Sequence, residues 1–164
     1  MREGASGSRV VIGAHCRSER ARTLRRGHAN VDLDPPLAHD RGATVPDAEY
    51  DRNNIFARIL RNEIPSTRVY EDDEFVAFRD IAPAAPVHLI VIPRGEPPTS
   101  PAGLTEADAG MVGRLVLTAV RVAAEQGLSE RGYRLVMNCG DHGGQSVAHL
   151  HLHVLGGGPL GPVA

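Results

Sequence analysis

The fold of this chain is decided by the seven residues His149-Leu150-His151-Leu152-His153-Val154-Leu155. Histidine and aliphatic residues alternate strictly in this stretch, and a period of two is typical of a half-buried β-strand. The alternation predicts one face with all three histidines and a second face with Leu150, Leu152 and Val154. Residues on the same face of a strand lie about 6.6 Å apart, so we expect the three imidazoles in a row about 13 Å long.

A glycine-rich turn, Gly143-Gly144-Gln145-Ser146, comes just before the histidine stretch. Backbone N–H groups in such a turn can form a cradle for an anion. Three titratable rings next to an anion-binding turn indicate a chemical site, because a purely structural strand has no need of three histidines in register.

Three interpretations of the histidines are open at this point. Alternate histidines on a strand can bind zinc. They can also be structural polar groups, which is the usual role of a single histidine but not of three in register. In the third interpretation one imidazole is a nucleophile, and its neighbours stabilise an anionic, phosphate-like transition state.

The composition narrows the class of protein. A chain of 164 residues with a net charge of −2 has the size of one domain with room for a tail, and its charge gives no reason to expect nucleic acid or a membrane as partner. No apolar run approaches the ~18 residues that a membrane span requires. Cys16 and Cys139 form no recognisable spacing, so we expect free thiols in a reducing compartment and a cytoplasmic protein. All 18 basic residues are arginine, which we interpret as the coding bias of a bacterial genome rich in G and C.

Residues 1–48 differ from the rest of the chain. Met1–Asn30 contains seven arginines, two acidic residues and a single short apolar run, Val10-Val11-Ile12. No segment here could bury enough apolar area to offset the entropy of ordering it. We therefore expect a disordered extension, or a start codon assigned too far upstream. An organelle-targeting peptide, which has a similar composition, fits a bacterial origin less well.

The domain itself is expected over residues 49–164. A short helix capped by Asn53 or Asn54 should end before Pro65, and a long helix should begin at Thr105, with Asp108 completing a capping-box-like pair. Strands are expected at 67–71, 75–79, 87–92, 133–138 and 149–155. This order predicts an α+β fold with a five-stranded antiparallel sheet and two helices, in which the long helix covers the face of the sheet that carries Leu150 and Leu152.

The histidine stretch resembles the signature of the histidine triad (HIT) superfamily, in which three histidines alternate with apolar residues. Other stretches between about Asn53 and Gly157 resemble its nucleotide-binding, purine nucleoside phosphoramidase branch, in the same order along the chain. They are Ile55-Phe56-Ala57-Arg58-Ile59, Glu63-Ile64-Pro65, Tyr70-Glu71-Asp72-Asp73, Ala77-Phe78-Arg79-Asp80-Ile81, Ala85-Pro86-Val87-His88, Val91-Ile92-Pro93, Arg134-Leu135-Val136-Met137-Asn138 and Gly143-Gly144-Gln145-Ser146-Val147. Several spaced motifs in order are more specific than one triad alone.

The resemblance implies catalytic roles for particular residues. His151 would attack the α-phosphorus of a nucleoside monophosphate ester or amide, giving a nucleotidyl-histidine that water then cleaves. His153 would hold phosphate oxygens, and Gln145 and Ser146 would contact the phosphate or the leaving group. We expect neighbouring cationic imidazoles to lower the pKa of His151 and keep it neutral.

The resemblance also implies an outer pair of histidines and a nucleotide-binding slot. His88 and His149 would support proton movement, Asn138 would lie at the rim of the phosphate site, and Asp80 would grip the ribose hydroxyls. The walls of the purine slot would be Phe56, Phe78 and Ile81. Each assignment has a structural alternative: Asp80 and Ser146 as turn residues, His88 in a structural hydrogen bond, Phe56 and Ile81 as part of the core.

Two positions depart from the pattern of many bacterial relatives. Those relatives have Cys-x-x-Cys around the Ile-Phe pair, which binds a structural zinc together with two histidines, whereas this chain has Asn54 and Ala57 there. Without thiolates the tetrahedral site is incomplete, so we expect no metal and no cofactor.

The resulting hypothesis is a metal-independent hydrolase of nucleoside 5′-phosphoramidates, with a purine nucleotide as substrate and a homodimer as its assembly. Two alternatives are a dinucleoside polyphosphate hydrolase and a nucleotide-binding interaction module with incidental turnover.

Overall fold

The computed structural model describes residues 49–162, which lie within one compact unit. The predicted extension over residues 1–48 lies outside the described residues. Within residues 49–162, no helix is long and apolar enough to cross a membrane.

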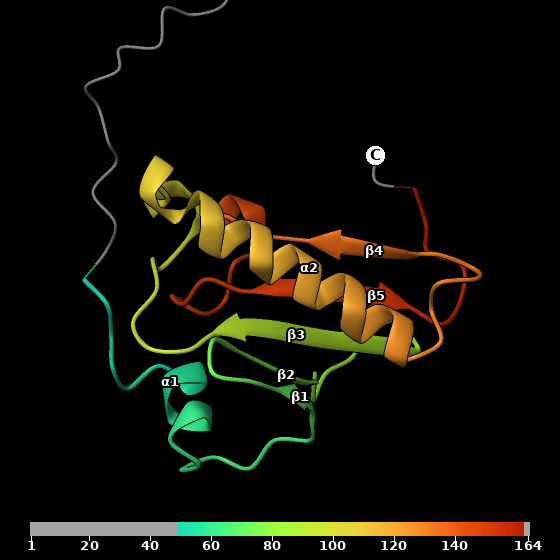
Figure 1. Ribbon diagram of the computed structural model, residues 1–164, viewed down its shortest axis with the longest axis horizontal. Helices are drawn as coiled ribbons and strands as arrows, with labels where there is room; N and C mark the ends of the chain where they lie inside the picture. The colour runs from blue at the N-terminus through green and yellow to red at the C-terminus, as the bar shows by residue number, and fades with distance from the viewer. Residues whose placement is uncertain (1–48, 163–164) are drawn as a thin grey trace, which may run out of the picture. The chain divides into compact units, whose positions relative to one another are not determined.

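Five antiparallel strands form one sheet in the order β1-β2-β3-β5-β4 (Figure 1). The strands are β1 (Arg68–Glu71), β2 (Phe75–Arg79), β3 (Val87–Pro93), β4 (Tyr133–Val136) and β5 (Leu152–Gly156). The predicted α+β fold with a five-stranded antiparallel sheet is confirmed. The sheet order places β3 and β5, which carry His88 and His153, side by side at its centre.

The long helix α2 (Ala109–Glu125) packs across one face of the sheet, as Figure 1 shows. The Asp108 carboxylate accepts hydrogen bonds from the Thr105 N–H and hydroxyl, both at 2.8 Å, so the predicted capping pair is confirmed. The first turn after Thr105 is a 3₁₀ turn, Glu106–Asp108, and the α-helix begins later than predicted, at Ala109. The core under α2 includes Leu150, Leu152 and Val154. The helix therefore covers the predicted face.

The short helix α1 (Ile55–Leu60) packs against the opposite face. Asn54 caps it, because its side-chain oxygen accepts a hydrogen bond of 2.9 Å from the Ala57 N–H. Phe56 and Ile59 join Val76, Phe78, Ile90 and Ile92 in a second apolar cluster. The alternation of residues alone suggested that the histidine face of the sheet is open to a ligand. In the structure α1 covers part of this face.

The histidine stretch is only partly a strand, so its predicted extent is wrong. β5 begins at Leu152, opposite Val91, and His149 and His151 precede it. The ladder stops at the pair Val91 and Leu152 although β3 continues to Pro93. Pro93 has no N–H to donate, and its carbonyl lies 3.0 Å from Nε2 of His149. The Leu150 N–H instead bonds to the Pro98 carbonyl at 2.9 Å. β4 also ends two residues earlier than predicted, at Val136.

Candidate active site

His88 and His153 lie on neighbouring strands and on the same face of the sheet. In the register of β3 and β5, His153 is opposite Ile90, and His88 is opposite Leu155. Nε2 of His88 and Nδ1 of His153 lie 2.8 Å apart. The Ala84 N–H donates to Nδ1 of His88 at 3.1 Å, so the ring proton of neutral His88 is on Nε2. His88 therefore donates to His153, which keeps its own proton on Nε2.

His151 is the ring whose Nε2 atom has a lone pair available for nucleophilic attack. Its Nδ1 lies 2.7 Å from the backbone carbonyl of His149, which can only accept. The neutral ring therefore carries its proton on Nδ1 and its lone pair on Nε2. The rings of His151 and His153 are 4.9 Å apart between centroids, in an edge-to-face arrangement. A ring with a free lone pair thus lies next to a ring with an N–H donor.

His149 does not face a ligand, contrary to the prediction of an open row. Its ring is 0% exposed. Nε2 lies 3.0 Å from the Pro93 carbonyl and must donate to it, which leaves Nδ1 as an acceptor. The Tyr50 hydroxyl lies 2.6 Å from this Nδ1 and is the donor that it requires.

The predicted purine-slot residues fall into two groups. Phe56 and Phe78 are buried, with ring centroids 5.7 Å apart, and Phe56 also meets the ring of His151 edge-to-face at 5.2 Å. Ile81 is 92% exposed, so the expectation that it is partly core is wrong. Ile81 follows β2 in a bend at the surface, where no core element covers it.

Asp80, the predicted ribose ligand, lies at the end of β2 beside the histidines. One carboxylate oxygen accepts the Ala82 N–H at 2.8 Å, and the other lies 3.4 Å from Nε2 of His88. The Asp80 carboxylate therefore lies within ion-pair distance of His88 and next to the space where a ligand would bind.

The glycine-rich loop is more self-contained than the sequence suggested. The N–H groups of Gly143, Gly144 and Gln145 all bond to carbonyls within the loop, so they are not available to an anion in this arrangement. Gly140 and Gly144 have φ values of 65° and 75°, which few other residues adopt. The prediction that these three N–H groups form an anion cradle is therefore wrong for this loop conformation.

Three predicted residues of this region have different surroundings. Gln145 donates to the carbonyls of Thr99 (2.6 Å) and Val147 (2.9 Å) and accepts from the Gly140 N–H (3.1 Å), so it braces the loop. A contact between its amide and phosphate would require one of these bonds to break. Asn138 lies 3.5 Å from the Gly144 carbonyl, and Ser146 is exposed at the end of the loop.

Burial is the main cause of the pKa shifts in the site. It lowers the pKa of His149 to about 4 and the pKa of His153 to about 4. Burial also lowers the pKa of His151, while the hydrogen bond to the His149 carbonyl opposes the shift. The rings are therefore neutral near pH 7. The expected cause, neighbouring cationic imidazoles, is wrong for His151.

Three side chains of the site are close enough together to be considered as metal ligands. Asp80, His88 and His153 each place one potential ligand atom within 4.8 Å of the others. An ion there would have to displace the proton that His88 donates to His153. At the positions of the cysteine pair in relatives, Asn54 caps α1 through the Ala57 N–H, and both ring nitrogens of His149 already have partners. These residues do not fit a structural zinc. The absence of zinc stays a prediction that elemental analysis of the purified protein can check.

Comparisons with known proteins identify the family to which this chain belongs. The model of the HIT domain family matches residues 61–160. The chain belongs to the HIT domain family. The purine nucleoside phosphoramidase of Escherichia coli K12 is 49% identical over 109 residues, which cover 66% of this chain and 91% of that protein. The adenylylsulfatase HINT1 of Arabidopsis thaliana is 43% identical, covering 74% and 82%.

Solved structures agree with this HIT domain. The HIT family hydrolase of Legionella pneumophila superposes with a TM-score of 0.64 at 42% identity, covering 66% of this chain and 96% of that one. The HIT family hydrolase of Clostridium thermocellum gives 0.65 at 42% identity, covering 68% and 96%.

Tyr50 is a residue of the site that the sequence did not predict. Tyr50 lies before the first predicted helix and outside the matched residues 61–160. The only signal in the sequence was an aromatic residue among charged ones, which by itself predicts nothing.

Proposed function

We propose that this HIT domain is a nucleotide-binding hydrolase that cleaves nucleoside 5′-phosphoramidates through a covalent intermediate on His151. The observation that carries the proposal is the contact of 2.7 Å between Nδ1 of His151 and the His149 carbonyl, which assigns the ring proton to Nδ1. Its Nδ1–H is held by the His149 carbonyl, so its Nε2 lone pair is free beside the N–H of His153. The similarity to the Escherichia coli phosphoramidase supports this class of substrate.

In the first step Nε2 of His151 attacks the α-phosphorus, and the P–N bond breaks. The amine leaves with the bonding electrons and needs a proton, which we route from solvent through the exposed Ser146 hydroxyl. The Nδ1–H of His151 remains bonded to the His149 carbonyl and stabilises the positive charge of the substituted ring. The Nε2–H of His153 donates to a phosphate oxygen that gains charge in the transition state.

In the second step water attacks the same phosphorus, and His151 leaves as a neutral imidazole with its proton still on Nδ1. The water proton passes to solvent, so the site returns to its starting state. No residue in this scheme requires a metal.

The nucleotide itself would be held beside the histidines. The Asp80 carboxylate would accept the ribose hydroxyls, turning from its position 3.4 Å from His88. The base would lie against exposed Ile81, with Phe56 and Phe78 forming the buried floor. Asn138 would lie at the rim of the phosphate site. The outer pair differs in role: His88 is bonded to His153, whereas His149 is withdrawn into the core.

The substrate class is tested with a panel of an adenosine 5′-phosphoramidate, a diadenosine polyphosphate, a sugar nucleotide and adenosine 5′-phosphosulfate, the last because of the Arabidopsis relative. We expect the phosphoramidate to have the highest kcat/KM. A preference for the polyphosphate would favour the alternative hydrolase, and tight mononucleotide binding with slow turnover of all four would favour an interaction module.

The covalent step is tested by rapid quenching with substrate followed by peptide mapping. We expect the nucleotidyl group on His151. His151→Ala should abolish turnover but keep mononucleotide binding, while His153→Ala and Ser146→Ala should cost less, because each removes one contact among several. His142→Ala, in the exposed part of the neighbouring loop, is the matched control and should turn over normally. An adduct on another residue would refute the mechanism.

A homodimer joined along the sheet or the long helix completes the proposal. β4 is an edge strand, and Leu117 and Val120 of α2 are 67% and 41% exposed. Sedimentation at several concentrations checks the assembly.

A further inference from the structure

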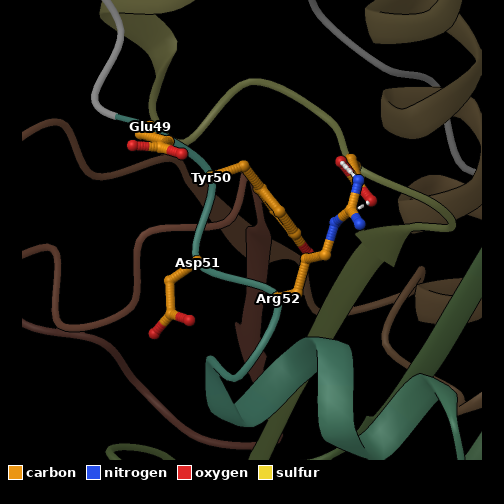
Figure 2. A pocket seen from close by; sticks show the side chains of 5 residues that line it. Glu49, Tyr50, Asp51 and Arg52 are labelled. Atoms are coloured by element: carbon orange, nitrogen blue, oxygen red, sulfur yellow. Dashed lines mark hydrogen bonds and ion pairs between the residues drawn. The ribbon is translucent and has the colours of Figure 1, made fainter.

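Tyr50 reaches the active site from a segment to which no role has been assigned. It precedes α1, and its side chain points inward beside Arg52, as Figure 2 shows. Arg52 forms an ion pair of 2.7 Å with Glu96 in the loop after β3, so the Tyr50 segment is joined to that loop. These residues, with Glu49 and Asp51, line an open hollow of about 710 Å³.

The Tyr50 hydroxyl provides a hydrogen-bond donor that the buried ring of His149 needs. His149 is 0% exposed, and its Nε2–H is used by the Pro93 carbonyl. Its Nδ1 would be a buried acceptor without a partner unless a donor were supplied, and leaving such a group unpaired is costly. The Tyr50 hydroxyl has one proton and lies 2.6 Å from this Nδ1 but 3.4 Å from the Gly95 carbonyl, so the closer Nδ1 receives it. The two rings pack with centroids 5.6 Å apart.

The same histidine holds the nucleophile through its backbone. The His149 carbonyl accepts the Nδ1–H of His151 at 2.7 Å, and that bond leaves the lone pair on Nε2. The ring of His149 is therefore held at both nitrogens, and its carbonyl is aimed at the next ring. Tyr50, His149 and His151 form one connected row of hydrogen bonds.

We propose that Tyr50 is a positioning residue for the nucleophile: its hydroxyl fixes the ring of His149, and the carbonyl of His149 fixes the Nδ1–H of His151. The inference rests on the proposed reaction for its effect on turnover, but the hydrogen bonds can be tested without turnover. Tyr50 does not touch substrate. Its loss should reduce kcat and leave KM nearly unchanged, because the ribose and base contacts lie elsewhere.

The test is Tyr50→Phe in the full-length protein, which removes one oxygen and keeps the ring. The matched control is Tyr70→Phe, because the Tyr70 hydroxyl also donates to a side chain, Asp72, but on the surface. Three measurements are made on both variants: kcat and KM with an adenosine 5′-phosphoramidate, the ¹⁵N-resolved imidazole signals of His149 and His151, and the pH dependence of kcat.

We expect Tyr50→Phe to lower kcat about tenfold with KM within about twofold of the parent value. The Nδ1–H signal of His151 should broaden, and the acid limb of kcat should move to higher pH because Nδ1 of His149 becomes easier to protonate. Tyr70→Phe should match the parent protein in all three.

Two results would overturn the inference. One is a Tyr50→Phe variant that matches Tyr70→Phe throughout. The other is a fall in kcat with unchanged imidazole signals and pH profile, which would mean that Tyr50 does not act through His149. If the parent protein does not cleave the phosphoramidate, the proposed function fails, and the imidazole signals alone decide the positioning role.

Discussion

At His88 and His149 the two ring nitrogens face partners of different kinds, whereas at His151 Nδ1 faces a backbone carbonyl and Nε2 keeps its lone pair. A backbone N–H fixes the proton on Nε2 of His88, and a backbone carbonyl fixes it on Nδ1 of His151. Backbone partners cannot exchange donor and acceptor roles, so these tautomers are stable as long as the local backbone is. The proton position in the neutral rings of His88 and His151 therefore depends on a single backbone atom near each ring.

The first prediction concerns the pH dependence of turnover. The nucleophile must be neutral, and burial lowers the pKa of His151 from its ordinary value of about 6.5. The acid limb of kcat/KM for an adenosine 5′-phosphoramidate should therefore have an apparent pKa below about 6.5. A limb at or above that value would mean that the free enzyme exposes His151 to solvent, contrary to its burial.

The elements of the fold differ in how far the sequence could predict them. β2 has the predicted bounds, and the Thr105–Asp108 pair is where expected, because both depend on local patterns. The start of β5 could not be predicted, because it depends on where the ladder with β3 stops, at the pairing of Val91 with Leu152, two residues far apart along the chain. Alternation of residue type continues through His149, but the hydrogen-bonded strand does not.

The candidate site shows the same limit. The family resemblance implied that these side chains share one site, and His88, His151 and His153 do lie together with Asp80, whereas their roles toward a phosphate stay a prediction. It could not predict that Gln145 is committed to three bonds within the loop region, since those partners are set by loop conformation. Tyr50 was missed for the same reason.

The second prediction concerns the core beneath α2. Leu150 is 0% exposed, and removing a buried leucine loses its transfer free energy and leaves a cavity. Leu150→Ala should lower the free energy of unfolding by about 3 kcal/mol, measured by urea denaturation. Leu117→Ala, on the outer face of α2, is the matched control and should change it by less than about 0.5 kcal/mol in a monomer. Equal effects of the two variants would contradict the assigned packing.

At the scale of the whole molecule, the described residues form one sheet with a helix on each face. α2 covers one face of the sheet, α1 packs on the other, and each face has its own apolar cluster. The domain boundary predicted at residue 48 is not tested by this arrangement and stays a prediction. With this boundary, Tyr50 is the second residue of the domain.

The third prediction follows from that boundary. Deletion of residues 1–48 should change the melting temperature by less than about 5 °C and leave kcat unchanged. Deletion of residues 1–50 serves as the comparison, because it also removes the Tyr50 hydroxyl from His149. Thermal melts and turnover of both truncated proteins check the boundary. A large loss of stability in the shorter deletion would show that the extension is part of the fold.

The neutral state of these histidines affects how the protein binds an anionic ligand such as a nucleotide. At pH 7 the burial-lowered pKa values leave the rings of His149, His151 and His153 without charge. Several arginines are engaged in ion pairs with glutamates, among them Arg52, Arg58, Arg68, Arg94, Arg114 and Arg121. We therefore expect a phosphate beside His151 and His153 to be held by N–H dipoles and not by charge on these two rings, and dipoles act only at short range.

Ionic strength should consequently have little influence on capture of the ligand. The dissociation constant of AMP should change by less than about twofold between about 20 and about 200 mM sodium chloride, although the screening length falls several-fold over that range. Titration calorimetry at both salt concentrations measures the effect. A steep weakening with salt would reveal a cationic group in the binding site. Without one, this enzyme would select its ligand by the fit of donors and acceptors and not by long-range attraction.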